Sequence, residues 1–435
     1  MQFSDFALDA RLQRAVEAAG YTTPTPIQTD TIPLGLAGRD IVGTAQTGTG
    51  KTAAFVLPIL QRLLTQPATT NRTRALIITP TRELAEQINT TIKQLAKFTN
   101  LQSATVYGGV GMQPQERALR SGVPIIVACP GRLLDHIERG TANLKHVEVL
   151  VLDEADRMLD MGFLPSVKRI LTHVPRERQT MLFSATFAPE LNALAAQTLR
   201  DPARIAVGTD APAKTIAHAL YPVPQHRKTA LTLTLLEQLD TNSVLIFTRT
   251  KHRANRVAQQ IEREGYAVAA LHSNKSQSAR QQALDGFRSG KVRVLVATDI
   301  AARGLDIATI SHVINYDIPE TADTYIHRIG RTGRAERTGD AVTLVTGEDT
   351  ATIRDIERTL KSRIERRTVA GFDYDAPAPA ANEFQRAPQQ PRGGSRSFAP
   401  RPAAQPRSAG QRPAPAGSAK PRSQRSGGER RAAGN

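Results

Sequence analysis

The chain has 435 residues, which is long for one domain and suggests two compact units with a tail. Its 57 Lys and Arg outnumber 40 Asp and Glu, and the formal net charge of +17 favours nucleic acid over a membrane surface as a partner. A merely solvated basic surface is the alternative. The single cysteine, Cys129, excludes an intramolecular disulfide and a zinc site built on paired cysteines, which predicts the reducing environment of the cytoplasm.

The N-terminal segment mixes charged residues with apolar ones. Its charged positions include Asp5, Asp9, Arg11, Arg14 and Glu17. A secretory signal peptide or a membrane span needs an uninterrupted apolar stretch, so neither fits this segment. The pattern predicts an amphipathic helix and no membrane partner.

Short apolar runs alternate with helical patterns over residues 30–207. Continuous Val, Ile and Leu runs indicate strands covered on both faces, and the helical stretches between them favour a parallel sheet. The expected strands are 40–42, 75–78, 124–127, 147–152 and 181–183. We therefore predict a doubly wound α/β domain over 30–207, preceded by a separate region over 1–29 and followed by a linker over 208–220.

The same alternation resumes over residues 221–370 and predicts a second α/β domain. Its expected strands are 244–247, 292–296, 313–316 and 341–345. After Asp375 the sequence contains no Val, Ile, Leu or Met, and residues 386–435 hold eleven Lys or Arg against one acid, Glu429. Such a segment cannot bury enough apolar surface to offset its ordering entropy, so we expect a disordered basic tail over 371–435.

A glycine-rich stretch directly follows the first expected strand and opens a helix. Its glycines let backbone N–H groups approach phosphates, Lys51 can meet the outer phosphates, and the Thr52 hydroxyl can reach Mg²⁺. The stretch predicts a nucleoside triphosphate site with Mg²⁺. Its residues are Ala45, Gln46, Thr47, Gly48, Thr49, Gly50, Lys51 and Thr52.

Two carboxylates follow the apolar run 147–152. Asp153 and Glu154 should therefore lie at the carboxyl end of a strand, where open α/β sheets bind ligands. We expect Asp153 to hold Mg²⁺ through water and Glu154 to orient or deprotonate the water that attacks the γ-phosphate. Alone, the acidic group could equally be a helix N-cap. The nearby pair Lys51 and Thr52 favours the catalytic interpretation.

The second domain has no phosphate loop of this spacing. It carries instead a basic cluster from His327 to Arg334, between a helical and a strand pattern. Arginines supplied from across a cleft can stabilise charge on a transferred phosphoryl group. One nucleotide would then serve both domains. A surface cluster unrelated to phosphate is the alternative.

The ordered motifs resemble those of the DEAD-box RNA helicases over residues 1 to about 365. The resemblance implies two tandem RecA-like domains with ATP and Mg²⁺ as cofactors, and Phe3 and Gln28 match the family's adenine-reading positions. It also implies ribose contact by Asp306 and γ-phosphate contact by Arg331 and Arg334. Further matching residues would couple hydrolysis to strand separation: Asp156, Ser184, Ala185, Thr186 and His327.

The same resemblance implies RNA contacts that are mainly backbone contacts. The matching positions are Pro80, Thr81, Arg82, Gly108, Gly109, Gly131, Arg132, Gln277, Arg280 and Thr298. Cys129 stands where the family usually has Thr, which puts one hydrogen bond to an RNA phosphate in doubt. We expect this cysteine to be a small buried hydrophobe, because it follows the apolar run 125–127. The sequences of residues 247–251 and 272–277 most resemble those of the bacterial RhlE-like branch of the family.

These motifs predict a monomeric, cytoplasmic, RNA-dependent ATPase that separates short RNA duplexes and remodels RNA or RNA–protein complexes. Ribosomal and RNA-decay proteins are candidate partners. A DNA-dependent translocase would share the phosphate loop, and an RNA-binding scaffold without productive unwinding would share the basic tail. The scaffold is the weaker alternative, because it has no need for Lys51, Glu154 and the two arginines together.

Overall fold

The computed structural model describes residues 1–45, 48–68, 71–207, 216–238, 243–299, 310–332 and 339–377. The compact unit Met1–Ala378 holds two seven-stranded sheets, one in each of the two expected α/β domains. All paired strands among the described residues are parallel. The expected fold class is therefore confirmed.

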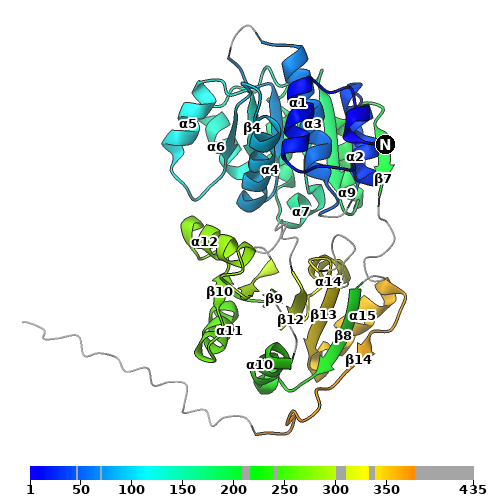
Figure 1. Cartoon of the computed structure of the whole chain (residues 1–435), viewed down its shortest axis with the longest axis vertical. Helices are drawn as coiled ribbons and strands as arrows, with labels where there is room; N and C mark the ends of the chain where they lie inside the picture. The colour runs from blue at the N-terminus through cyan, green and yellow to red at the C-terminus, as the bar shows by residue number, and fades with distance from the viewer. Residues whose placement is uncertain are drawn as a thin grey trace, which may run out of the picture. The chain divides into compact units, whose positions relative to one another are not determined.

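The first sheet has the order β3-β4-β2-β5-β6-β1-β7. Figure 1 labels β4 and β7 in this domain. Its strands are β1 Ile41–Thr44, β2 Ala75–Ile78, β3 Ser103–Val106, β4 Ile125–Ala128, β5 Val149–Leu152, β6 Gln179–Ser184 and β7 Ala203–Ala206. Its helices are η1 Phe3–Asp5, α1 Ala10–Ala18, α2 Pro26–Leu36, α3 Lys51–Thr65, α4 Arg82–Leu95, α5 Met112–Arg120, α6 Pro130–Glu138, α7 Ala155–Asp160, α8 Leu164–Leu171 and α9 Pro189–Thr198.

Helices cover both faces of this sheet because its strands are apolar at consecutive positions. Successive side chains of a strand point to opposite faces. Ile41 and Ile77 belong to a core shared with α1 to α4, whereas Val42 and Leu76 belong to a second core shared with α5 to α9. The unbroken apolar runs of the sequence thus correspond to strands buried on both sides.

The second sheet has the order β10-β11-β9-β12-β13-β8-β14. Its strands are β8 Ile216–Pro222, β9 Val244–Phe247, β10 Val268–Leu271, β11 Val294–Ala297, β12 His312–Asn315, β13 Gly339–Val345 and β14 Glu365–Arg366. Its helices are η3 Gln225–Arg227, α10 Lys228–Gln238, α11 Lys251–Arg263, α12 Gln277–Arg288, α14 Ala322–Ile329, η4 Gly347–Asp349 and α15 Thr350–Leu360. One face packs against α12, α14 and α15, and the other against α10 and α11.

Parallel pairing brings the segments that follow the strands to one edge of each sheet. In the first sheet this carboxyl edge receives the phosphate loop after β1, Pro80 and Thr81 after β2, and Asp153 and Glu154 after β5. Ser184, the last residue of β6, lies at the same edge. Motifs that are far apart in the sequence therefore meet because of the topology.

Several strands were not anticipated from the sequence. β3, β7 and β10 are short and partly exposed, and each lies at or near a sheet edge, where large apolar side chains are not required. β8 begins at Ile216, inside the expected linker 208–220, because Ile216 and Leu220 are buried in the second domain. Residues 208–215 lie outside the described residues.

The first residues assigned to the tail have described positions on the second domain. Phe372 and Tyr374 pack against the core beside α10 and α11, with their ring centroids 4.8 Å apart. Arg227 donates hydrogen bonds to the carbonyl oxygen of Asp373 at 3.1 and 2.7 Å. These aromatic residues are the signal that a composition-based boundary at 371 overlooks. Residues 378–435 lie outside the described residues.

Cys129 is the N-cap residue of α6. It is 8% exposed, and its side chain makes no capping hydrogen bond to the first turn of the helix. Burial raises the pKa of the Cys129 thiol to about 12, so the thiol is protonated at neutral pH and is a poor nucleophile. The expectation of a small buried residue at this position agrees with its low exposure.

We predict that Cys129→Thr stabilises the first domain by about 1 kcal/mol, because a threonine hydroxyl at the N-cap accepts a hydrogen bond from the first turn. In a thermal unfolding experiment this gain should raise the midpoint of the first domain by about 2–4 °C. Cys129→Val, which has a similar shape but no acceptor, is the matched control. An equal gain in the valine variant would attribute the effect to packing and refute the capping explanation.

Candidate active site

The phosphate loop connects β1 to the first turn of α3. Gly48 and Gly50 have φ angles of 87° and 94°, a left-handed conformation that side chains disfavour. A Cβ on Gly50 would lie 2.6 Å from Nε2 of Gln28, so close packing also requires glycine there. Lys51 is 7% exposed, and its ammonium donates a hydrogen bond to the carbonyl oxygen of Ala45 at 2.7 Å. Gln46 and Thr47 lie outside the described residues.

Gln28 connects the N-terminal region to this loop. It is 2% exposed; its Nε2 donates to the carbonyl oxygen of Gly50 at 3.1 Å, and its Oε1 accepts from the Thr25 amide at 2.9 Å. Phe3 is buried, and its ring meets the ring of Tyr21 edge-on at 5.7 Å. Tyr21 lines a cavity of about 720 Å³ together with the phosphate loop, whereas Phe3 contacts the Tyr21 ring without lining this cavity.

Asp153 and Glu154 lie at the end of β5 and line the same cavity. They are 2% and 3% exposed. Burial raises the pKa of the Asp153 carboxyl to about 6, although the nearby Lys51 ammonium opposes the shift. Glu154 has a φ of 53°, a strained conformation for a residue with a side chain. Two buried carboxylates are costly unless a nearby cation or hydrogen bonds offset their charge.

Arg157 supplies that cation for Glu154. Its Nη1 lies 2.6 Å from Oε2 of Glu154, and the two side chains are 3% and 4% exposed. They are three residues apart, at the start of α7, so one helical turn brings them together. Sequence reasoning missed Arg157, and its only signal was the i, i+3 spacing to a buried acid.

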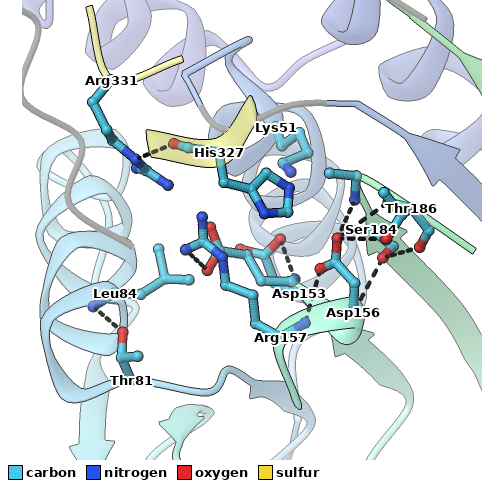
Figure 2. Close-up of polar contacts among 12 residues, drawn as sticks. Lys51, Thr81, Leu84, Asp153, Asp156, Arg157, Ser184, Thr186, His327 and Arg331 are labelled. Atoms are coloured by element: carbon cyan, nitrogen blue, oxygen red, sulfur yellow. Dashed lines mark hydrogen bonds and ion pairs between the residues drawn. The ribbon is translucent and has the colours of Figure 1, made fainter. Parts of the chain in front are cut away.

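Asp156 joins α7 to the end of β6 (Figure 2). Its Oδ2 accepts hydrogen bonds from the amides of Ala185 and Thr186 at 3.0 and 3.1 Å, and from the Thr186 hydroxyl at 3.4 Å. In return, the Ser184 hydroxyl accepts from the Asp156 amide at 3.1 Å. Four of the five residues expected to couple hydrolysis to strand separation therefore form one hydrogen-bonded group within the first domain.

His327, near the end of α14, lies close to this carboxylate group (Figure 2). Burial and the neighbouring Arg157 lower the pKa of His327 to about 4, with Asp156 opposing, so its imidazole is neutral at pH 7. Arg331 is 4% exposed and donates from Nε to the carbonyl oxygen of His327 at 3.2 Å. Arg334 and Asp306 lie outside the described residues.

The expected RNA-contacting residues lie on both domains. Thr81 caps α4, and Arg82 lies over the loop after β3, where a Cβ on Gly109 would be 2.1 Å from its Nη1. The Arg132 guanidinium donates to the carbonyl oxygen of Val110, on that same loop, at 3.3 Å. Pro80 is buried, and a Cβ built on Gly131 would meet no atom within 4 Å. In the second domain, the Thr298 amide donates a hydrogen bond to the carbonyl oxygen of Leu271 at 3.3 Å.

Gln277 and Arg280 were expected to contact RNA, but here they bind the start of α4. Arg280 lies 2.8 Å from Glu83, and both side chains are at most 9% exposed. Gln277 donates to Glu83 and accepts from Arg82, each at 3.4 Å. Arg280 thus has a buried acid as its partner in this structure.

Comparison with known proteins places this geometry in a family. The model "DEAD/DEAH box helicase" matches residues 25–194, and the model "Helicase conserved C-terminal domain" matches residues 227–336. Together they cover more than half of the chain. The chain belongs to the DEAD/DEAH box helicase family.

Curated relatives agree with this family. The DEAD-box ATP-dependent RNA helicase CshA of Geobacillus kaustophilus is 41% identical over 365 residues, 84% of this chain and 78% of the relative. The protein of the same name from Bacillus subtilis is 42% identical and is covered to 73%. These two relatives carry the CshA name.

Solved helicase structures have the same fold. Dbp5 of S. cerevisiae bound to RNA and ADP BeF3 is 31% identical, with a TM-score of 0.75 over 84% of this chain and 95% of that one. A DEAD box protein from Methanococcus jannaschii is 36% identical, with a TM-score of 0.51 over 84% and 99% of the two chains. Among the described residues of this helicase, no helix is both long enough and apolar enough to cross a bilayer.

We predict that Arg157→Met lowers the free energy of unfolding of the first domain by about 3 kcal/mol, because it leaves Glu154 buried without this partner. Arg169→Met is a matched control: Arg169 and Glu138 also lie 2.6 Å apart but are 63% and 54% exposed. Loss of this exposed pair should cost under about 1 kcal/mol. Urea unfolding measures both values, and equal losses would contradict the importance of burial.

Proposed function

We propose that this helicase is an RNA-dependent ATPase that separates short RNA duplexes and remodels RNA or RNA–protein complexes. The observation that carries the proposal is the buried pair Asp153 and Glu154 beside Lys51, at a phosphate loop and within one cavity. Relatives named ATP-dependent RNA helicases, and a solved relative bound to RNA and ADP BeF3, support RNA as the second ligand.

The residues of this cavity fit ATP and Mg²⁺. Oxygen ligands suit Mg²⁺, and Asp153 and the Thr52 hydroxyl supply them beside the loop. Bound Mg²⁺ would stabilise charge on the phosphates, and its positive charge would favour the ionised Asp153 carboxyl, whose pKa burial raises to about 6. We assign adenine recognition to Gln28, together with the edge-to-face pair Phe3 and Tyr21.

Lys51 would hold the outer phosphates after exchanging its hydrogen bond with Ala45 for a phosphate oxygen. Glu154 would orient or deprotonate the attacking water, with Arg157 holding its carboxylate in place. Arg331 and Arg334 would stabilise charge on the γ-phosphate, and Asp306 would bind the ribose. His327 and the group around Asp156 would couple hydrolysis to the RNA-bound state.

Binding of ATP and RNA would favour one closed arrangement of the two domains. A site shared by both domains is complete only when they meet, so each ligand increases the affinity for the other. We infer that the closed form bends the RNA strand it holds, so that a short duplex separates locally. Hydrolysis then releases the strand.

We predict that Glu154→Gln reduces RNA-stimulated ATP hydrolysis by at least about a hundredfold, because an amide cannot act as a base. ATP affinity should change by less than about threefold, since the phosphate loop is intact. Steady-state hydrolysis and equilibrium nucleotide binding measure the two effects. Undiminished hydrolysis in this variant would refute the role assigned to Glu154.

A DNA-dependent translocase is the main alternative, and comparison of RNA with DNA as activators of hydrolysis separates the two. A non-hydrolysing RNA scaffold is the second. We further propose that the protein is a monomer in the cytoplasm and that ribosomal or RNA-decay proteins are its partners. We also propose that it belongs to the RhlE-like branch. The wording of residues 247–251 and 272–277 supports that branch, whereas the relatives described above carry the CshA name.

We predict that removal of residues 378–435 weakens RNA affinity without changing hydrolysis in the absence of RNA. Residues 386–435 carry eleven Lys or Arg and one acid, and cations that contact phosphates release counterions. The slope of log affinity against log salt should therefore become shallower in the truncated chain. Unchanged affinity at low salt would remove RNA binding from the roles of the tail.

A further inference from the structure

The loop that carries Gly108 and Gly109 leaves an edge strand. β3 lies at the end of its sheet and pairs with β4 alone. The carbonyl oxygen of Val106, its last residue, accepts from the amide of Cys129 at 2.9 Å. Successive residues of a strand direct their backbone groups to opposite sides, so Tyr107 directs its amide and carbonyl toward the open edge.

Gln115, on the first turns of α5, binds both of these groups. Its Oε1 accepts from the Tyr107 amide at 3.1 Å, and its Nε2 donates to the carbonyl oxygen of Tyr107 at 3.2 Å. The same Nε2 donates to the carbonyl oxygen of Gly111 at 3.0 Å. One side-chain amide therefore holds the loop at both ends, in the way that a neighbouring strand would.

Gln115 is buried, and the loop that it holds is bound from the other side by α4. The side chain is 6% exposed, so loss of its hydrogen bonds would leave backbone groups unpaired rather than hydrated. On the other side of the loop the Tyr107 hydroxyl donates to Glu86 of α4 at 2.6 Å. Arg82, on the same helix, lies over Gly109, whose φ is 83°. The two glycines are thus held between α4 and α5.

We propose that Gln115 is a positioning residue for RNA binding, which sets the backbone of Gly108 and Gly109 in the conformation that receives an RNA phosphate. The inference rests on the proposed function, because the two glycines are RNA contacts only if the protein binds RNA. Gln115 itself contacts backbone groups of the loop. Its contribution lies in ordering the loop before the RNA arrives.

The test compares Gln115→Met with Gln179→Met in the full-length chain. Gln179 is 5% exposed and also donates to two backbone carbonyls, those of Gly35 and Arg39, each at 2.9 Å. Each substitution removes a buried amide from the first domain, but only Gln115 touches the loop. Affinity is measured with a fluorescein-labelled oligouridine of ten nucleotides and a non-hydrolysable ATP analogue, at about 0.2 M salt, where non-specific electrostatic binding is weak.

We expect Gln115→Met to raise the Kd for RNA about tenfold, because the released loop must be ordered on binding. Hydrolysis without RNA and the KM for ATP should stay within about twofold of the wild type, as the phosphate loop is unchanged. Gln179→Met should leave the Kd for RNA unchanged. An equal effect of both substitutions, or no effect of either, would overturn the positioning role.

A second variant covers the case in which Gln115→Met does not fold. Gln115→Glu keeps the acceptor for the Tyr107 amide, but as a carboxylate it repels the two carbonyl oxygens. Protonation restores a donor, so its Kd for RNA relative to the wild type should fall as pH decreases from about 8 to about 6. A ratio independent of pH would contradict the proposal. A wild-type protein that fails to bind the oligouridine would refute the proposed function instead.

Discussion

Burial of carboxylates beside a phosphate loop is the constraint on which the rest of the structure depends. Asp153 and Glu154 are almost fully buried, and a buried charge is costly unless a cation or hydrogen bonds offset it. Arg157 supplies one cation to Glu154, and Lys51 opposes the upward pKa shift of Asp153. In the proposed function, a bound Mg²⁺ would add a further cation beside these carboxylates.

The parallel sheet extends this local constraint to the whole first domain. Its carboxyl edge places the phosphate loop, Asp153 and the end of β6 side by side, and Asp156 binds the amides of Ala185 and Thr186. In the proposed mechanism, these hydrogen bonds would carry a change at the nucleotide to the segment after β6. At the edge strand β3, backbone groups on the open side of the sheet have no neighbouring strand to bind. The side-chain amide of Gln115 takes that place for Tyr107, at the start of the glycine loop.

Much of this was predictable from the sequence, for identifiable reasons. The strands with unbroken apolar runs were expected close to their observed positions, because burial on both faces requires such runs. Edge strands such as β3 and β10 were missed, since partial exposure removes that requirement. In the site, the glycines, Lys51 and the carboxylates were expected from their spacing. Arg157 was not, because its role depends on which side chains become neighbours after folding.

In the proposed mechanism, ATP and RNA bind to one coupled site across both domains. The most direct test is the Kd of a single-stranded oligouridine, measured with and without a non-hydrolysable ATP analogue. Coupling through a shared closed form predicts at least about tenfold tighter RNA binding when the analogue is present, and a reciprocal gain in nucleotide affinity. Equal RNA affinities in the two conditions would contradict it.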